Sequence, residues 1–125
     1  MKIESYRDLH IWQKGMDVAE KCWLMTQSFP KVELFGLTSQ IRRAVSSVPA
    51  NIAEGYGRGT TREYLRFLRV AQGSLKELET HILLSARVGI CQSKESSQLL
   101  QITDELGRMI VTLIHKLEIK IGSRE

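Results

Sequence analysis

Six arginine residues are concentrated in the middle of the sequence. They lie within residues 42–69, a window whose acidic residues are Glu54 and Glu63 alone. The rest of the chain contains equal numbers of basic and acidic residues, so this window carries the whole formal net charge of +4. A guanidinium group binds phosphate through two parallel hydrogen bonds, which favours an anionic partner for this window. The six residues are Arg42, Arg43, Arg58, Arg62, Arg66 and Arg69.

The spacing of the last three arginines indicates how they are presented. Arg62, Arg66 and Arg69 follow the pattern i, i+4, i+7, so they line one face of a helix over roughly 10 Å. Arg58 stands just before this helix, and aromatic residues at positions 56, 64 and 67 are interleaved with the arginines. Such a stripe is typical of surfaces that follow a phosphate backbone and stack on bases. Two alternatives stay open: a solvated face whose arginines pair with nearby carboxylates, and a contact surface for the acidic residues of a neighbouring subunit.

The segment GYGRGTTRE, residues 55–63, joins two helical patterns and combines glycines, hydroxyls and arginines. Such a combination can cradle a phosphate group. The segment lacks the Gly-Lys-Ser/Thr sequence and a preceding strand, which excludes a nucleotide-binding P-loop. We therefore predict that Gly55 ends the preceding helix in a left-handed conformation and that a flexible turn follows. The remaining alternative is a local anchor for a nucleic-acid backbone.

No set of residues indicates catalysis. Asn51 and Glu54 closely follow Pro49, and an enzyme would use such a glutamate as a general base. No nucleophile or histidine stands beside Glu54, so we expect both residues to cap loosened backbone groups or to bond across a subunit interface. The three histidines form neither Glu-x-x-His nor His-Glu-x-x-His, which argues against a metal site. We expect no enzymatic activity and no cofactor.

Apolar residues recur at helical spacing in four segments, which predicts helices at about 9–29, 38–55, 60–89 and 93–122. Thr60 and Ser93 are the expected N-caps, and Thr60 forms a capping box with Glu63. These lengths and the short connections predict one domain over residues 1–125: an all-α, antiparallel up-down-up-down four-helix bundle. The two tryptophans share a helical face and are expected to be core or interface anchors. The apolar stripe of the first helix comprises Leu9, Trp12, Met16, Ala19 and Trp23.

Two residues interrupt these helical patterns. Pro49 removes a backbone donor within the second helix, so we expect a kink there, with Ser46 and Ser47 rebonding a freed carbonyl group. Gly73 lies in the middle of the third helix, where glycine costs about 1 kcal/mol relative to alanine. We expect the close approach of another helix to offset this cost, either within the bundle or between subunits.

The remaining composition is that of a protein outside membranes. Cys22 and Cys91 are isolated in the sequence, which favours reduced thiols over a disulfide framework. The N-terminal residues lack an apolar signal segment, and the longest nearly apolar run, residues 109–114, is too short to span a bilayer. We therefore expect a cytoplasmic protein without membrane segments.

Two blocks of the sequence resemble a known family. QIRRAVSSVPANIAEGYGR at 40–58 and EYLRFLRVAQGSLKELET at 63–80 resemble the four-helix-bundle proteins encoded by intervening sequences in bacterial 23S rRNA genes. Relatives of that family include the accessory variability determinant of diversity-generating retroelements. DLHIWQKGMDVAEKCW and FPKVELFGL match the family's first helix and loop. The fourth helix matches in hydrophobic pattern alone.

The resemblance implies a small four-helix bundle that assembles into a homo-oligomer, with a pentameric ring as the expected form. It implies no enzymatic activity. The accessory determinant is thought to bind nucleic acid and to partner a reverse transcriptase. Together with the basic window, this gives non-enzymatic binding of structured RNA or an RNA/DNA hybrid as the leading expectation, in the role of an accessory to a reverse transcriptase. The alternative is a structural or protein-interaction module whose arginines serve subunit contacts.

Overall fold

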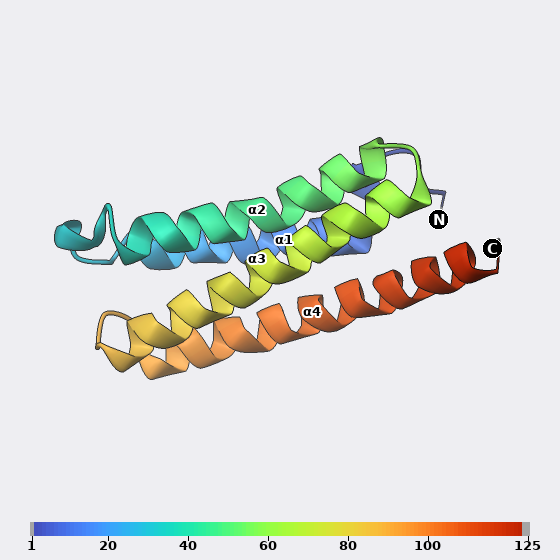
Figure 1. Ribbon diagram of the computed structural model, residues 1–125. Helices are drawn as coiled ribbons and strands as arrows, with labels where there is room; N and C mark the ends of the chain where they lie inside the picture. The colour runs from blue at the N-terminus through green and yellow to red at the C-terminus, as the bar shows by residue number, and fades with distance from the viewer. Residues whose placement is uncertain (1, 124–125) are drawn as a thin grey trace.

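The computed structural model describes residues 2–123, and these form four α-helices and two short 3-10 helices without strands. This confirms the predicted all-helical fold of four helices. In chain order the elements are η1 (Tyr6–Asp8), α1 (His10–Thr26), η2 (Lys31–Glu33), α2 (Leu37–Gly57), α3 (Thr61–Arg87) and α4 (Ser93–Gly122), as drawn in Figure 1.

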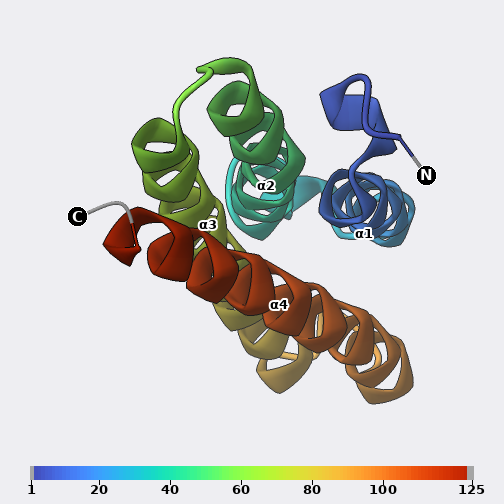
Figure 2. The same cartoon turned by 90° about the vertical axis from the view of Figure 1, so that its right-hand side faces the viewer.

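Helix α2 lies between α1 and α3, and α4 runs along α3 (Figure 2). Contacts pair the start of α2 with the second half of α3, where Arg43 meets Glu77. Other contacts pair the end of α2 with the start of α3, where Gly55 meets Phe67. The core lies between the helices and is built from branched aliphatic side chains that are almost wholly excluded from solvent. Its largest members include Ile41, Ile52, Leu68, Leu75, Leu78, Ile82, Leu106 and Ile110.

The apolar stripe predicted for the first helix is not the stripe that α1 buries. Four core-facing residues of α1, namely Ile11, Gly15, Val18 and Cys22, each stand one position before a residue of the predicted stripe, which lies beside them toward the outer surface. There Met16 is 44% exposed and Trp23 is 45% exposed, while Trp12 and Ala19 are half-buried. Both stripes have the same spacing, and the placement of the neighbouring helices decides which is covered. The buried stripe comprises Ile11, Gly15, Val18, Cys22 and Met25.

The predicted helix ends are confirmed at some positions and wrong at others. Thr60 caps α3 as expected, because its hydroxyl oxygen accepts a hydrogen bond from the Glu63 backbone N–H at 3.2 Å. The other half of the predicted capping box is wrong, because the Glu63 carboxylate bonds to Arg66 instead. Gly89 follows α3 with a φ of 80° and ends it. Ser93 is not a cap: it is the first residue of α4, and Gln92 holds the cap position without a side-chain bond. Helix α1 ends at Thr26, three residues before the expected end at residue 29.

Gly55 does not end α2, which contradicts the prediction. The helix continues to Gly57, and the left-handed glycine of the turn is Gly59, with a φ of 85°. Gly55 is buried where α2 packs against α3. A methyl group added to Gly55 would lie 2.6 Å from the Cβ atom of Phe67 and 3.2 Å from the ring of Tyr64. The absence of a side chain is therefore what allows the two helices to approach here.

Pro49 lies inside α2, which continues through it without interruption. The proline is buried against α1, since a Cβ atom added to Gly15 would lie 3.4 Å from the Pro49 Cβ atom. The nearby serines do not bond where we expected. The Ser46 hydroxyl donates to the carbonyl oxygen of Arg42 at 2.7 Å, and the hydroxyl oxygens of Ser47 and Ser74 lie 2.8 Å apart across α2 and α3. The proline thus contributes an apolar packing surface toward α1.

Asn51 bonds to the turn of α2 that precedes Pro49. Its side-chain amide donates to the Ser47 carbonyl oxygen at 2.7 Å and to the Ser47 hydroxyl oxygen at 2.9 Å. These bonds span the turn in which the proline offers no backbone donor.

Gly73 is exposed, and a Cβ atom added there would meet nothing within 4 Å. The expected close approach of another helix within the bundle is therefore wrong. A contact between subunits at Gly73 stays a prediction.

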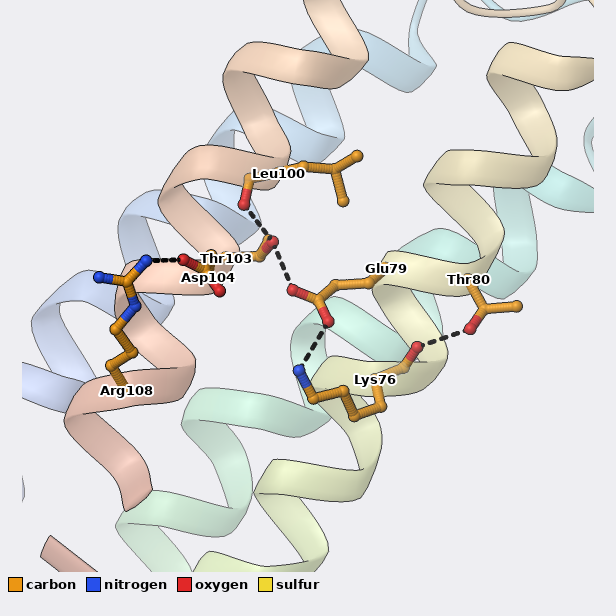
Figure 3. Close-up of polar contacts among 7 residues, drawn as sticks. All are labelled: Lys76, Glu79, Thr80, Leu100, Thr103, Asp104 and Arg108. Atoms are coloured by element: carbon orange, nitrogen blue, oxygen red, sulfur yellow. Dashed lines mark hydrogen bonds and ion pairs between the residues drawn. The ribbon is translucent and has the colours of Figure 1, made fainter. Parts of the chain in front are cut away.

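A polar contact links α3 to α4 beneath the surface (Figure 3). Thr103 is fully buried, and its hydroxyl oxygen lies 2.9 Å from Glu79 Oε2 and 3.0 Å from the Leu100 carbonyl oxygen. The other carboxylate oxygen of Glu79 accepts a hydrogen bond from Lys76 Nζ at 3.0 Å. Because the Glu79 side chain is largely buried, the Thr103 hydroxyl replaces part of the water that its carboxylate loses.

We predict opposite effects of alanine at two glycines of this fold. Gly55→Ala should lower the free energy of unfolding by about 1–3 kcal/mol, because the added methyl group overpacks the contact with Phe67. In the single, unassembled chain Gly73→Ala should raise the free energy of unfolding by about 0.5–1 kcal/mol, because the position is open and alanine favours helix. Urea unfolding followed by circular dichroism measures both values. Equal effects of the two substitutions would contradict the assigned contact.

A second prediction concerns the link between α3 and α4. Thr103→Val keeps the side-chain shape but leaves a Glu79 oxygen without its partner, which should cost about 1–3 kcal/mol in unfolding free energy. Thr112→Val is the matched control, because the exposed Thr112 hydroxyl bonds to Arg108 of its own helix alone. The control should change stability by less than about 0.5 kcal/mol. Similar losses in both variants would show that the Glu79 contact contributes nothing.

Candidate nucleic-acid interface and apolar groove

The structure does not gather the six arginines into one patch. Arg42 points toward α1, where its Nε atom donates to the Thr26 hydroxyl at 2.9 Å and its guanidinium group lies 4.1 Å from the Trp23 ring centroid. Arg43, the next residue, points instead toward α3 and pairs there with Glu77. Adjacent positions of a helix face directions about 100° apart, which separates these two charges.

The arginines around the turn between α2 and α3 pair with the carboxylates of their own helices. Arg58 forms an ion pair with Glu54 at 2.8 Å. Arg66 forms two bonds to Glu63, from Nε at 2.8 Å and from a terminal nitrogen at 3.4 Å. The hydrogen bond from Arg66 is the main cause that lowers the pKa of the Glu63 carboxyl group, and the same bond raises the pKa of Arg66. Glu63 therefore pairs with Arg66 across the first turn of α3 besides offering its backbone N–H to Thr60.

Two further carboxylates come from distant parts of the chain. Arg69 bonds to Glu118 of α4 at 2.7 Å, and Arg43 bonds to Glu77 of α3. The partners are 49 and 34 residues away in the sequence. Sequence inspection considered Glu54 and Glu63 as partners and missed these two, because only the packing of the helices brings them close. The arginine-rich face is accordingly less basic than the window 42–69 suggests. Arg62 is not free either.

The aromatic residues beside the arginines are also engaged within the chain. The guanidinium groups of Arg58 and Arg66 lie 5.0 and 4.4 Å from the Phe67 ring centroid. Tyr56 and Tyr64 form an edge-to-face pair with centroids 5.8 Å apart. The Tyr64 hydroxyl is buried without a hydrogen-bond partner in the described part of the chain, and burial is the main cause that raises its pKa to about 12. Tyr64 thus packs inward and does not offer a stacking platform for a base.

The side chains that could carry out chemistry are few and shielded. Burial raises the pKa of the Cys22 thiol to about 12 and also raises the pKa of Cys91. Among residues 2–123, no group of three or more histidine, cysteine, aspartate and glutamate side chains is arranged to hold a metal ion. Glu54, considered as a general base, is occupied by Arg58.

The structure has a second surface, which we call the α1–α2 groove; sequence reasoning named its two tryptophans as core or interface anchors but did not predict a groove. The outer stripe of α1 forms one wall of the groove, and small residues of α2 form the other. Its lining includes Trp12, Met16 and Trp23 from α1 and Ser46, Ala50 and Ala53 from α2. Tyr6 of η1 packs edge-to-face on Trp12, with ring centroids 5.3 Å apart, and is also part of the lining.

The sequence did contain a signal for this groove. Apolar or small residues occur in adjacent pairs along α1, namely Ile11–Trp12, Gly15–Met16, Val18–Ala19 and Cys22–Trp23. One core-facing stripe needs only one residue of each pair, so the apolar arc of α1 is wider than its contact with the core.

An exposed apolar loop lies beyond one end of the groove. We call it the 32–35 loop, since its tip comprises Val32, Leu34 and Phe35 between α1 and α2. Val32 is 85% exposed and Phe35 is 91% exposed. The loop projects past the end of the helices in Figure 1. A cluster of large, exposed apolar side chains of this kind is typical of interaction surfaces.

No helix in residues 2–123 is long and apolar enough to cross a membrane.

Comparisons with known proteins identify a structural neighbour and the family of this chain. It is similar to a structurally characterised protein of unknown function from the S23 ribosomal protein family of Bacteroides thetaiotaomicron, with a TM-score of 0.75 and 18% identity. The similarity covers 83% of this chain and 97% of that one, and at this identity it establishes the fold. No curated protein matches the sequence. The profile of the 23S rRNA-intervening sequence proteins matches residues 7–112, and the chain therefore belongs to the 23S rRNA-intervening sequence protein family.

Proposed function

We propose that this protein is a non-enzymatic interaction module that assembles with copies of itself. The observation that carries the proposal is the outward apolar stripe of α1, where Met16 and Trp23 are nearly half exposed beside the small residues of α2. An apolar surface of this kind on a small helical domain is stabilised when another protein covers it. The shielded thiols and the pairing of Glu54 with Arg58 support the non-enzymatic part of the proposal.

The proposal includes the finer architecture that the family resemblance implies. The helices would follow an antiparallel up-down-up-down order, and the copies would join in a homo-oligomeric ring, with five copies as the expected number. An exposed glycine at position 73 supports contact between subunits, because no neighbour in its own chain compensates for its cost in helix stability. We also propose that the protein acts in the cytoplasm.

Self-assembly predicts a specific response to a charge in the groove. Met16→Glu should lower the mass of the protein in solution, because burying a carboxylate in an apolar interface is costly. The fold should persist, since the Met16 side chain is already 44% exposed. Ile119→Glu on α4 is the control, because Ile119 is 72% exposed and lies outside the groove. Sedimentation equilibrium measures the masses. A wild-type protein that is monomeric at every accessible concentration would contradict the proposal.

Binding of nucleic acid is a second candidate function. It is supported by the exposure of the paired arginines, whose side chains at positions 43, 58, 66 and 69 are between 47% and 61% exposed. Exposed ion pairs contribute little to stability, so phosphate groups can displace the carboxylates. The ligand would be structured RNA or an RNA/DNA hybrid, and the protein would act as an accessory to a reverse transcriptase. The ion pairs within the chain make this candidate weaker than the sequence alone suggested.

A salt series tests nucleic-acid binding. If fluorescent structured RNA binds, the logarithm of the affinity should fall with the logarithm of salt concentration by about 0.7–0.9 per phosphate contact. The variant with Arg58, Arg62, Arg66 and Arg69 changed to alanine should lose affinity and most of this slope while keeping its mass. A variant with Lys21, Lys94, Lys116 and Lys120 changed to alanine removes the same four positive charges from exposed positions and is the control for total charge. Equal loss in both variants, or no binding by the wild type at low salt, would rule out this arginine face.

A further inference from the structure

The 32–35 loop and the α1–α2 groove are complementary in polarity. The loop presents its most exposed apolar side chains, Phe35 and Val32, at one end of the helices. The groove is lined by Trp12 and Met16 on one wall and by small alanine side chains on the other. Its volume of about 680 Å³ is within the range of clefts that enclose drug-sized ligands, so it has room for both apolar side chains of the loop.

The charges at the two surfaces are also complementary. Asp17 and Glu20 of α1 line the groove beside the apolar stripe. Lys31 precedes the apolar tip of the loop and is exposed. Within residues 2–123 the structure shows no ion pair for any of these three side chains, unlike the arginines at the α2–α3 contact. The loop also carries Glu33, whose Oε1 atom accepts a hydrogen bond from the Leu37 backbone N–H at the start of α2. The Glu33 carboxylate is thus directed toward α2, and Lys31 offers a positive charge to the acidic rim.

Within its own chain the loop reaches only the near end of the groove, where Leu34 and Phe35 line a hollow with Trp23 and Ser46. The loop connects the C-terminal end of α1, just beyond Trp23, to the N-terminal end of α2. It projects past this end of the helices (Figure 1). Trp12, Ala50 and Ala53 lie toward the middle and the opposite end of the same two helices. A loop that reaches those residues must come from another molecule.

We propose that the 32–35 loop of one copy inserts into the α1–α2 groove of the next copy, with Lys31 beside Asp17 and Glu20. This inference rests on the proposed self-assembly and names the two surfaces that make it. The contact joins two different surfaces, so it is head-to-tail, and each copy keeps one free loop and one free groove. Repetition of such a contact gives a ring if the rotation closes and a filament if it does not.

A mixing experiment tests the head-to-tail contact. A loop variant, Val32→Ser with Phe35→Ser, keeps its groove, and the groove variant Met16→Glu keeps its loop. Each should assemble at least about tenfold more weakly than the wild type, the loss expected for central aromatic or apolar contacts. Mixed together, the two variants should form a complex of one copy each, because one intact loop still meets one intact groove. Sedimentation equilibrium measures these masses, and circular dichroism confirms that both variants are folded.

Tryptophan fluorescence gives a second reading of the same contact. The chain has two tryptophans, and both Trp12 and Trp23 line the groove. The fluorescence emission of these two tryptophans should shift to shorter wavelength when the wild type assembles, and the loop variant should not show this shift. The control Ile119→Ser removes an exposed apolar side chain of α4 and should assemble like the wild type.

A charge exchange tests the pairing of the two surfaces. Two variants each reverse the charge of one surface: the loop variant Lys31→Glu, and the rim variant with both Asp17→Lys and Glu20→Lys. Each should weaken assembly by severalfold, and the variant that combines all three substitutions should recover most of the loss. Recovery requires that the loop and the rim meet in the complex. Absence of recovery, or absence of a mixed complex in the previous experiment, would overturn the inference. If the wild type assembles and the loop variant has the same assembled mass, the inference is overturned and the proposed self-assembly stands. If the wild type is monomeric, both are overturned.

Discussion

The close passage of α2 and α3 at Gly55 is the contact on which the surfaces of this protein depend. A side chain at this position would collide with the Cβ atom of Phe67, so the distance between the two helices is set by the missing methyl group. That distance places Phe67 beneath the guanidinium groups of Arg58 and Arg66 and turns Tyr64 inward. Further along the same pair of helices it brings Ser47 to Ser74 and Arg43 to Glu77.

The opposite side of α2 is held by a second close contact, between Pro49 and Gly15 of α1. With α2 covered on both flanks, its outward positions carry small residues such as Ala50 and Ala53. In the adjacent outer stripe of α1, Trp12 and Ala19 are half-buried, whereas Met16 and Trp23 stay 44% and 45% exposed. The α1–α2 groove is thus a consequence of how closely α1 and α2 approach, and its apolar character comes from an α1 helix that is apolar over two adjacent stripes.

Charge is distributed differently in space than along the sequence. The basic window 42–69 meets carboxylates at Glu77 and Glu118, which lie outside it. The ion pairs are exposed and hold the arginines in place more than they stabilise the fold. An anionic ligand must compete with these carboxylates, whereas the acidic rim of the α1–α2 groove and Lys31 of the loop have no such competitor among the described residues. This contrast favours contact between proteins over contact with nucleic acid.

The sequence by itself determined the four helices, the Thr60 cap and the end of α3 at Gly89, because spacing, capping and left-handed glycines are local properties. It also determined which residues carry charge. Only the tertiary structure decided which of two equally spaced stripes of α1 is buried, because the choice depends on where α2 packs. It likewise assigned Gly55 to a helix contact instead of a helix end, and it paired Arg69 with Glu118 across 49 residues. Those outcomes depend on distances between helices, and a local pattern carries no information about them.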